Sequence, residues 1–299
     1  MTATLSTIPQ KLKDIAFWQG DISVRPLTGG LSNESYIVSD QTGKYIARFC
    51  NDIPAHHVIR QHEAMVSRAA AHTGFAPELV YDAPGVMVFK FIEAKTYDKS
   101  DIVPNLQSLV TMIHRFHHIV GQETSGPGRI FWVFHVIRDY AHSLKADHSR
   151  FAEKLDGFTR IAAHLEDAQT PQPIVFTHND LLPANFMDDG EKIWLIDFEY
   201  AAYGTAMFDL ANLASNADFN DQQDEHLLQL YYKSPPNPQL LQSLAAMKCA
   251  SLLREAMWSM ISEIHLAAPG VDYGAYADEC LPAFYAELEK YQLKYGKIQ

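Results

Sequence analysis

Three polar residues that could support metal binding and proton transfer lie close together in an otherwise apolar stretch. Asp180 and Asn185 follow the apolar run at residues 174–178, and Asp197 ends a second apolar run, at residues 192–198. Unpaired polar groups are costly to bury, so we expect these side chains to have partners. A metal ion, another residue or a substrate would be a suitable partner for them.

His178, Asp180 and Asn185 fit the pattern H-x-D-x-x-x-x-N, and Asp197 comes twelve residues after Asn185. In the catalytic loop of kinases, this spacing supplies an Asp that accepts the proton of the substrate hydroxyl and an Asn that binds Mg²⁺. Mg²⁺ prefers hard oxygen ligands. We therefore expect Asp180 to be the catalytic base, with Asn185 and Asp197 as magnesium ligands. The alternative is a turn in which Asp180 and Asn185 only satisfy backbone amides.

A glycine-containing segment, "LTGGLSNESYIV", lies between the first two expected strands. Gly30 permits a close backbone approach, and Ser32 and Asn33 add donors for phosphate oxygens. The segment does not match GxGxxG, and a Gly-Gly hairpin turn is an equally good interpretation. Its position far upstream of Asp180 favours the phosphate-binding role.

Arg48 lies in the third expected strand and Glu63 in the helix that follows. A cation and a carboxylate in these places match the pair that positions nucleotide phosphates in kinases, although the cation here is Arg and not Lys. Because Arg can hold phosphate through two hydrogen bonds, the role survives the change. An exposed surface pair, which would contribute little, is the alternative.

The distribution of apolar residues predicts two lobes. The first, residues 1–93, has short β-rich runs separated by turns and one run of helical periodicity, which predicts an antiparallel five-stranded sheet with one helix at 56–72. The second, residues 94–299, is mainly helical, with a boundary between residues 92 and 98. The expected strands are 21–27, 34–38, 44–49, 78–82 and 86–92, and the later helices are 106–120, 149–165, 224–232, 239–266 and 277–295.

Composition narrows the class of partner. The chain has 299 residues, 47% hydrophobic and 20% charged, with a net charge of −12, which argues against nucleic acid and anionic membranes as partners. Its three cysteines show no metal-binding or disulfide spacing, and no apolar run reaches the roughly 20 residues that span a bilayer. We expect a cytoplasmic protein.

In these motifs the sequence resembles the choline/ethanolamine kinase family. That family is related to the aminoglycoside phosphotransferases within the protein-kinase-like fold. The matching segments span most of the chain in family order: "GGLSNESY", "IARF", "THNDLLPANF", "LIDFEYA", "GTAMFDLANLASNADF", "MWSMISEI" and "VDYGAY". The resemblance implies an α+β, bilobal protein-kinase-like fold. It also implies ATP and Mg²⁺ as cofactors and a small cationic amino-alcohol as substrate.

The resemblance assigns further roles. Adenine would bind through backbone groups between Phe91 and Glu93. The amine would lie among Tyr200, Trp258 and Tyr273, with Glu199 nearby, since a quaternary ammonium is attracted to ring faces by about 0.5 to 2 kcal/mol each. Core packing is the alternative for these aromatic residues. The oligomeric state is left open, with a homodimer among the states considered.

Two substrate-side positions depart from the eukaryotic members of the family. Glu255 replaces a tryptophan, and Asn216 replaces a carboxylate. An extra carboxylate suits a primary or smaller amine, whose hydrogens it can accept. Asp209, in contrast, is a position that resembles the family, and it is expected to brace the catalytic loop and not to touch the substrate, with a helix N-cap as the alternative.

The expected function is an ATP-dependent small-molecule kinase that phosphorylates the hydroxyl of a small amino-alcohol such as choline or ethanolamine. The alternatives are an aminoglycoside or thiamine-type phosphotransferase and a non-catalytic nucleotide-binding module with a kinase-like fold.

Overall fold

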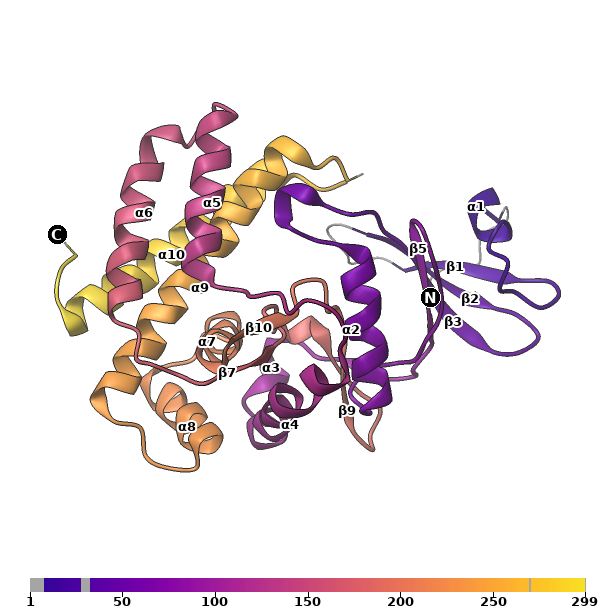
Figure 1. Ribbon diagram of the computed structural model, residues 1–299, viewed down its shortest axis with the longest axis horizontal. Coiled ribbons are helices and arrows are strands. Elements are labelled where there is room, and N and C mark those ends of the chain that lie inside the picture. Colours follow the sequence, from indigo (N-terminus) through magenta and orange to yellow (C-terminus); the bar gives the residue numbers. More distant parts are fainter. Residues whose placement is uncertain (1–7, 28–32, 269, 299) are drawn as a thin grey trace.

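The N-terminal part of the protein is an antiparallel five-stranded sheet. The computed structural model describes residues 8–27, 33–268 and 270–298, and its first sheet has the strand order β1-β2-β3-β5-β4 (Figure 1). The predicted sheet is therefore confirmed. Its strands are β1 (Ser23–Leu27), β2 (Glu34–Ser39), β3 (Lys44–Phe49), β4 (Leu79–Ala83) and β5 (Val86–Lys90).

Alternating side chains give this sheet two packed faces. Val38 of β2 and Ala47 of β3 are fully buried and share one apolar cluster with Leu12 of the short helix α1 (Gln10–Lys13). A second cluster contains Ala64 of α2 (Arg60–His72) together with Met87 of β5. Figure 1 shows α2 on the side of the sheet that faces the helical part, and α1 on the other side.

The predicted helix at 56–72 begins four residues late. Residues 54–56 form a 3₁₀ turn, η1 (Pro54–His56), and α2 starts only at Arg60. His57 lies in the left-handed region with φ 59°, and an antiparallel bridge joins Ile53 to Val58, so the chain reverses before the helix. A regular α-helix cannot pass through a left-handed residue.

The C-terminal part is mainly helical, as predicted. The long helix α9 is buried along most of its length and packs against α5, α6, α7 and α10. The periodicity does not predict α7, because all but its last residue is buried and it has no polar stripe. The helices are α3 (Lys99–Ile102), α4 (Leu106–Ile119), α5 (Val133–Ala146), α6 (Ala152–Asp167), α7 (Ala206–Asn216), α8 (Asp221–Tyr232), α9 (Pro238–His265) and α10 (Tyr273–Tyr295), with a 3₁₀ turn η2 (Val120–Glu123).

Two small sheets hold the segment that carries the polar residues. β7 (Ile174–Thr177) pairs with β10 (Ala202–Thr205), and β9 (Ile193–Leu195) pairs with β8 (Phe186–Asp188), which in turn pairs with β6 (Lys95–Thr96). The two apolar runs are thus strands, as predicted, but they belong to different sheets. The loop between β7 and β8, including a 3₁₀ turn η3 (Pro183–Asn185), spans the gap between them. Within the described residues, no helix is both long and apolar enough to cross a membrane.

Candidate active site

A buried carboxylate holds the start of the loop after β7. Asp209 of α7 is fully buried and accepts the backbone N–H of His178 at 2.8 Å and of Asn179 at 2.7 Å. His117 Nε2 lies 2.9 Å from the same carboxylate. Burial alone would raise the pKa of Asp209, but its hydrogen bond and ion pair with His117 lower it. Asp209 therefore braces the loop, as predicted, while Thr205 is the N-cap of α7.

His178 anchors the loop from inside. Its Nε2 lies 3.0 Å from the carbonyl oxygen of Ile196, and the backbone N–H of Asp180 donates to its Nδ1 at 3.2 Å. These two partners require a neutral ring with the proton on Nε2. Burial lowers the pKa of His178, in agreement with this tautomer. His178 thus positions Asp180 relative to the segment that leads to Asp197.

The structure brings Asp180 and Asn185 into contact. Asn185 Nδ2 donates to the backbone carbonyl of Asp180 at 2.7 Å and to its carboxylate at 3.2 Å, so the amide oxygen of Asn185 faces away from Asp180. Asp197 has φ 68°, in the left-handed region that Asp and Asn tolerate better than most residues. Its Oδ1 lies 3.2 Å from Arg48 Nη1.

The oxygen donors fit Mg²⁺. Asn185 would contribute an amide oxygen and Asp197 a carboxylate, and Mg²⁺ is commonly held by one or two carboxylates while waters and phosphates complete the octahedron. In the described part of the chain, no group of three or more His, Cys, Asp and Glu could hold a metal by itself. A metal at this place would therefore take its remaining ligands from solvent or a phosphate-bearing substrate.

The carboxyl group of Asp180 is in an unusual electrostatic environment. Burial raises its pKa well above the ordinary 3.8, and the positive charge of Arg254 opposes that shift. The neighbouring negative charges of Glu255 and Asp197 raise the pKa further. A carboxyl group with a raised pKa holds a proton more strongly than an exposed Asp, which suits a general base.

A network of five charged side chains connects the N-terminal sheet and α2 to the segment after β9. Arg48 forms ion pairs with Glu63, predicted as its partner, and with Asp197. Arg60 Nη1 lies 2.6 Å from Glu63 and 2.8 Å from Glu199. Glu63 is fully buried, so the pair predicted from the sequence is not a surface pair. Arg60 is the member that the sequence did not indicate.

The other residues predicted to contact the nucleotide lie in the N-terminal lobe. Gly30 and Ser32 lie outside the described residues. Asn33 accepts a hydrogen bond from Arg60 Nη2 at 3.0 Å. The N–H of Phe91 donates to the carbonyl of Lys44 at 3.0 Å, so an adenine bound here would use other backbone groups. Glu93 is exposed and pairs with Lys44.

Three aromatic residues predicted for the substrate side gather near Asp180. Trp258 Nε1 donates to the hydroxyl of Tyr200 at 2.8 Å, and the rings of Trp258 and Tyr273 are 6.1 Å apart. One face of each of two rings is covered: the guanidinium of Arg254 lies 4.5 Å from the centre of the Tyr200 ring, and His56 stacks on Trp258 at 4.9 Å. Neither covering residue was expected from the sequence.

The two departures from the family pattern have different surroundings. Glu255 accepts hydrogen bonds from Tyr276 Oη at 2.8 Å and from Arg254 Nη1 at 3.1 Å. Asn216 is the half-buried last residue of α7. Asn212, one turn earlier, contacts the catalytic loop as Asp209 does, by accepting the N–H of Leu181.

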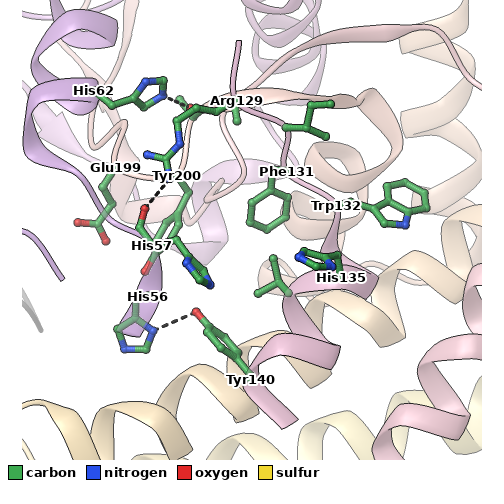
Figure 2. A pocket seen from close by; sticks show the side chains of 14 residues that line it. His56, His57, His62, Arg129, Phe131, Trp132, His135, Tyr140, Glu199 and Tyr200 are labelled. Atoms are coloured by element: carbon green, nitrogen blue, oxygen red, sulfur yellow. Dashed lines mark hydrogen bonds between the residues drawn. The ribbon is translucent and has the colours of Figure 1, made fainter. Parts of the chain in front are cut away.

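A cavity of about 400 Å³ adjoins Glu199 and Tyr200 on the side of α2. Figure 2 shows the side chains around it, including His56, which is hydrogen bonded to Tyr140 at 3.0 Å. Burial lowers the pKa of His56 to about 3, so this ring is neutral. Asp180 does not line this cavity. A larger cleft, of about 1160 Å³, runs between the first sheet and the start of α10 and includes Asn33 and Tyr273 in its walls.

Comparison with known proteins gives the family. A family model described as choline/ethanolamine kinase matches residues 24–239, well over half of the chain. The chain belongs to the choline/ethanolamine kinase family. Protein LicA of Haemophilus influenzae is 24% identical over 273 residues, covering 88% of this chain and 79% of LicA. A probable ethanolamine kinase of Arabidopsis thaliana is 26% identical over 275 residues, covering 80% and 72%.

Solved structures agree with this family. The structure of a choline/ethanolamine kinase family protein from Mesorhizobium loti has a TM-score of 0.70 at 26% identity, covering 95% of this chain and 92% of that one. LicA in complex with AMP has a TM-score of 0.71 at 20% identity, covering 93% and 97%. Spectinomycin phosphotransferase APH(9)-Ia has a TM-score of 0.60 at 13% identity, covering 95% and 99%. The last two show the fold alone.

Membership of the choline/ethanolamine kinase family confirms the resemblance and the bilobal, protein-kinase-like α+β fold expected from the sequence. It makes the protein a small-molecule kinase, a phosphotransferase with an alcohol group as acceptor.

Proposed function

We propose that this kinase transfers the γ-phosphoryl group of ATP to the hydroxyl of a small amino-alcohol, with Asp180 as the catalytic base. The observation that carries the proposal is the braced loop, in which Asp209 and His178 fix Asp180 next to Asn185. As the acceptor oxygen forms its bond to phosphorus, its proton passes to the carboxylate of Asp180, and the bond from phosphorus to the ADP oxygen breaks.

Asn185 and Asp197 would hold Mg²⁺ through their side-chain oxygens. When bound, Mg²⁺ neutralises charge on the phosphate oxygens. Arg48 supports this arrangement because it pairs with both Glu63 and Asp197, and so fixes the orientation of the Asp197 carboxylate. Gly30, Ser32 and Asn33, with the segment from Phe91 to Glu93, would contact the nucleotide. A solved LicA structure of the same fold is a complex with AMP, which supports nucleotide binding by this chain.

The acceptor would lie beside Tyr200, Trp258 and Tyr273, with Glu199, Asn216 and Glu255 around them. Relatives named for choline and for ethanolamine support an amino-alcohol. Because Arg254 covers one face of Tyr200 and His56 one face of Trp258, we expect a primary amine to be accepted better than a quaternary one. The cytoplasmic location and the homodimer stay predictions from the sequence.

A coupled assay of ADP release tests the proposal. The purified protein would receive ATP and Mg²⁺ with ethanolamine, its N-methylated derivatives, choline, thiamine and an aminoglycoside in turn. We expect ADP release that depends on a small amino-alcohol and the appearance of its phosphomonoester by ³¹P NMR. If only the aminoglycoside or only thiamine were phosphorylated, the assignment of a small amino-alcohol as the acceptor would be contradicted. Binding of Mg²⁺ and ATP without turnover on any alcohol would contradict the catalytic role.

A further inference from the structure

Arg254 lies in the proposed acceptor site on a fixed part of α9. One turn before it, Ser251 contacts Asn212, which holds the loop at Leu181, and one turn after it Trp258 binds the hydroxyl of Tyr200. The guanidinium is 4.5 Å from the centre of the Tyr200 ring. Ser251 and Trp258 lie on either side of Arg254 along α9, and their contacts hold this part of the helix next to the catalytic loop.

Three of the five N–H donors of the Arg254 guanidinium, the one on Nε and the two on Nη2, have no partner among the described residues. Arg254 is 2% exposed, and its Nη1 donates to Glu255 at 3.1 Å, whereas Nε and Nη2 are buried without any hydrogen-bond partner in the part of the chain that the structure describes. Leaving a buried donor unsatisfied costs about 1 to 3 kcal/mol, and more for a charged group. The Nε and Nη2 hydrogens point in parallel from one edge of the planar group, an arrangement that matches the two oxygens of a carboxylate.

The carboxylates expected to attract an amine are already paired. Glu199 is bound by Arg60 at 2.8 Å, and Glu255 is bound by both Arg254 and Tyr276. The same guanidinium also lies over one face of the Tyr200 ring, so that face is not open to an ammonium. The unsatisfied groups in the proposed site are therefore the Nε and Nη2 donors of the Arg254 cation. A negatively charged oxygen would satisfy them.

We propose that the acceptor is an amino-alcohol that also carries a carboxylate, and that Nε and Nη2 of Arg254 bind this carboxylate. The inference rests on the proposed function and narrows its substrate class. Arg254 is then the specificity-determining residue of the acceptor site. Nε and Nη2 are buried, so in this proposal the carboxylate reaches them from the acceptor site, and the contact also fixes the hydroxyl relative to Asp180.

Matched acceptors that differ by one carboxylate test this proposal. The pairs are serine with ethanolamine, homoserine with 3-aminopropanol, and carnitine with β-methylcholine, and the readout is kcat/KM from ADP release. In the wild-type enzyme we expect the carboxylate-bearing member of at least one pair to be preferred by about 100-fold or more, since a site built to bind a polar group rejects analogues that lack it. In Arg254→Met this ratio should fall to about 1, and Arg254→Lys should keep part of it.

Glu255→Gln is the matched control, because it removes the neighbouring carboxylate but keeps Arg254. It should retain or increase the preference. A wild-type enzyme that prefers the carboxylate-free member of every pair overturns the proposal, even if Arg254→Met fails to fold. The proposal is also overturned if Arg254→Met leaves the preference unchanged, or if Arg254→Met lowers kcat/KM equally for all acceptors. By contrast, absence of ADP release with every acceptor would count against the proposed function itself.

Discussion

Arg60 binds Glu199 across the two lobes, with Nη1 at 2.8 Å from the Glu199 carboxylate. The same nitrogen lies 2.6 Å from Glu63, which also pairs with Arg48, and Arg48 reaches Asp197. Charges of alternating sign therefore run from α2 to both carboxylates of the "DFE" segment. The proposed metal ligand Asp197 and the acceptor-side residue Glu199 share this support.

Replacing Arg60 with Met should lower the free energy of unfolding by about 3 to 5 kcal/mol, because Glu63 and Glu199 would stay buried without their partner. Urea unfolding followed by circular dichroism measures the change. Arg68→Met is the control on the same helix: Arg68 pairs with Asp82 at the surface, where such a pair contributes about 1 kcal/mol or less. Equal losses in the two variants would show that the buried pairing has no special role.

Asn185→Ala and Asp197→Ala should raise the Mg²⁺ concentration needed for nucleotide binding. Each removes a proposed oxygen ligand, so we expect an increase beyond the about 10- to 100-fold that follows loss of a supporting partner of a metal site. Calorimetric titration with ATP at several Mg²⁺ concentrations reports this without turnover. Asp189→Asn, in the turn before β9, should leave the Mg²⁺ requirement unchanged. An unaltered requirement in the first two variants would exclude these residues as ligands.

Asp180→Asn should make the protein more stable at neutral pH. The pKa of Asp180 is raised by burial in the folded protein above its value near 3.8 in the unfolded chain. The folded state therefore binds the proton more tightly, and the wild type loses stability as the pH rises from about 4 through the folded-state pKa. The Asn variant lacks this loss. Thermal unfolding at pH 4 and pH 7.5 should show a stability gap in favour of the variant that is larger at pH 7.5, and no change in the gap would refute the raised pKa.

Local patterns account for what the sequence could predict. The spacing of Asp180, Asn185 and Asp197 is a property of one chain segment, and alternation along β2 and β3 is visible without knowing their partners. The start of α2 was predicted too early because the left-handed residue His57 falls inside a run with helical periodicity.

Contacts between distant segments could not be predicted in this way. Arg254 contacts Tyr200, and His56 contacts Trp258, although the residues of each pair are far apart in the sequence. Neither Arg254 nor His56 belongs to a motif. Glu255 had looked like a carboxylate available to an amine, yet its neighbour Arg254 and the later Tyr276 both bind it. Arg60 gave one local sign, its position three residues before Glu63 on the same helix, but its contact with Glu199 depends on the packing of two lobes.

The most direct test of the central claim compares phosphoryl transfer by the wild type and by Asp180→Asn, with ³¹P NMR detection of the phosphorylated amino-alcohol. The variant keeps the size of the side chain and, as argued above, the fold, so nucleotide binding serves as the internal control. We predict a turnover lowered by about 10²- to 10⁴-fold, the range for loss of a general base. Turnover equal to that of the wild type would contradict the assignment of Asp180 as the catalytic base.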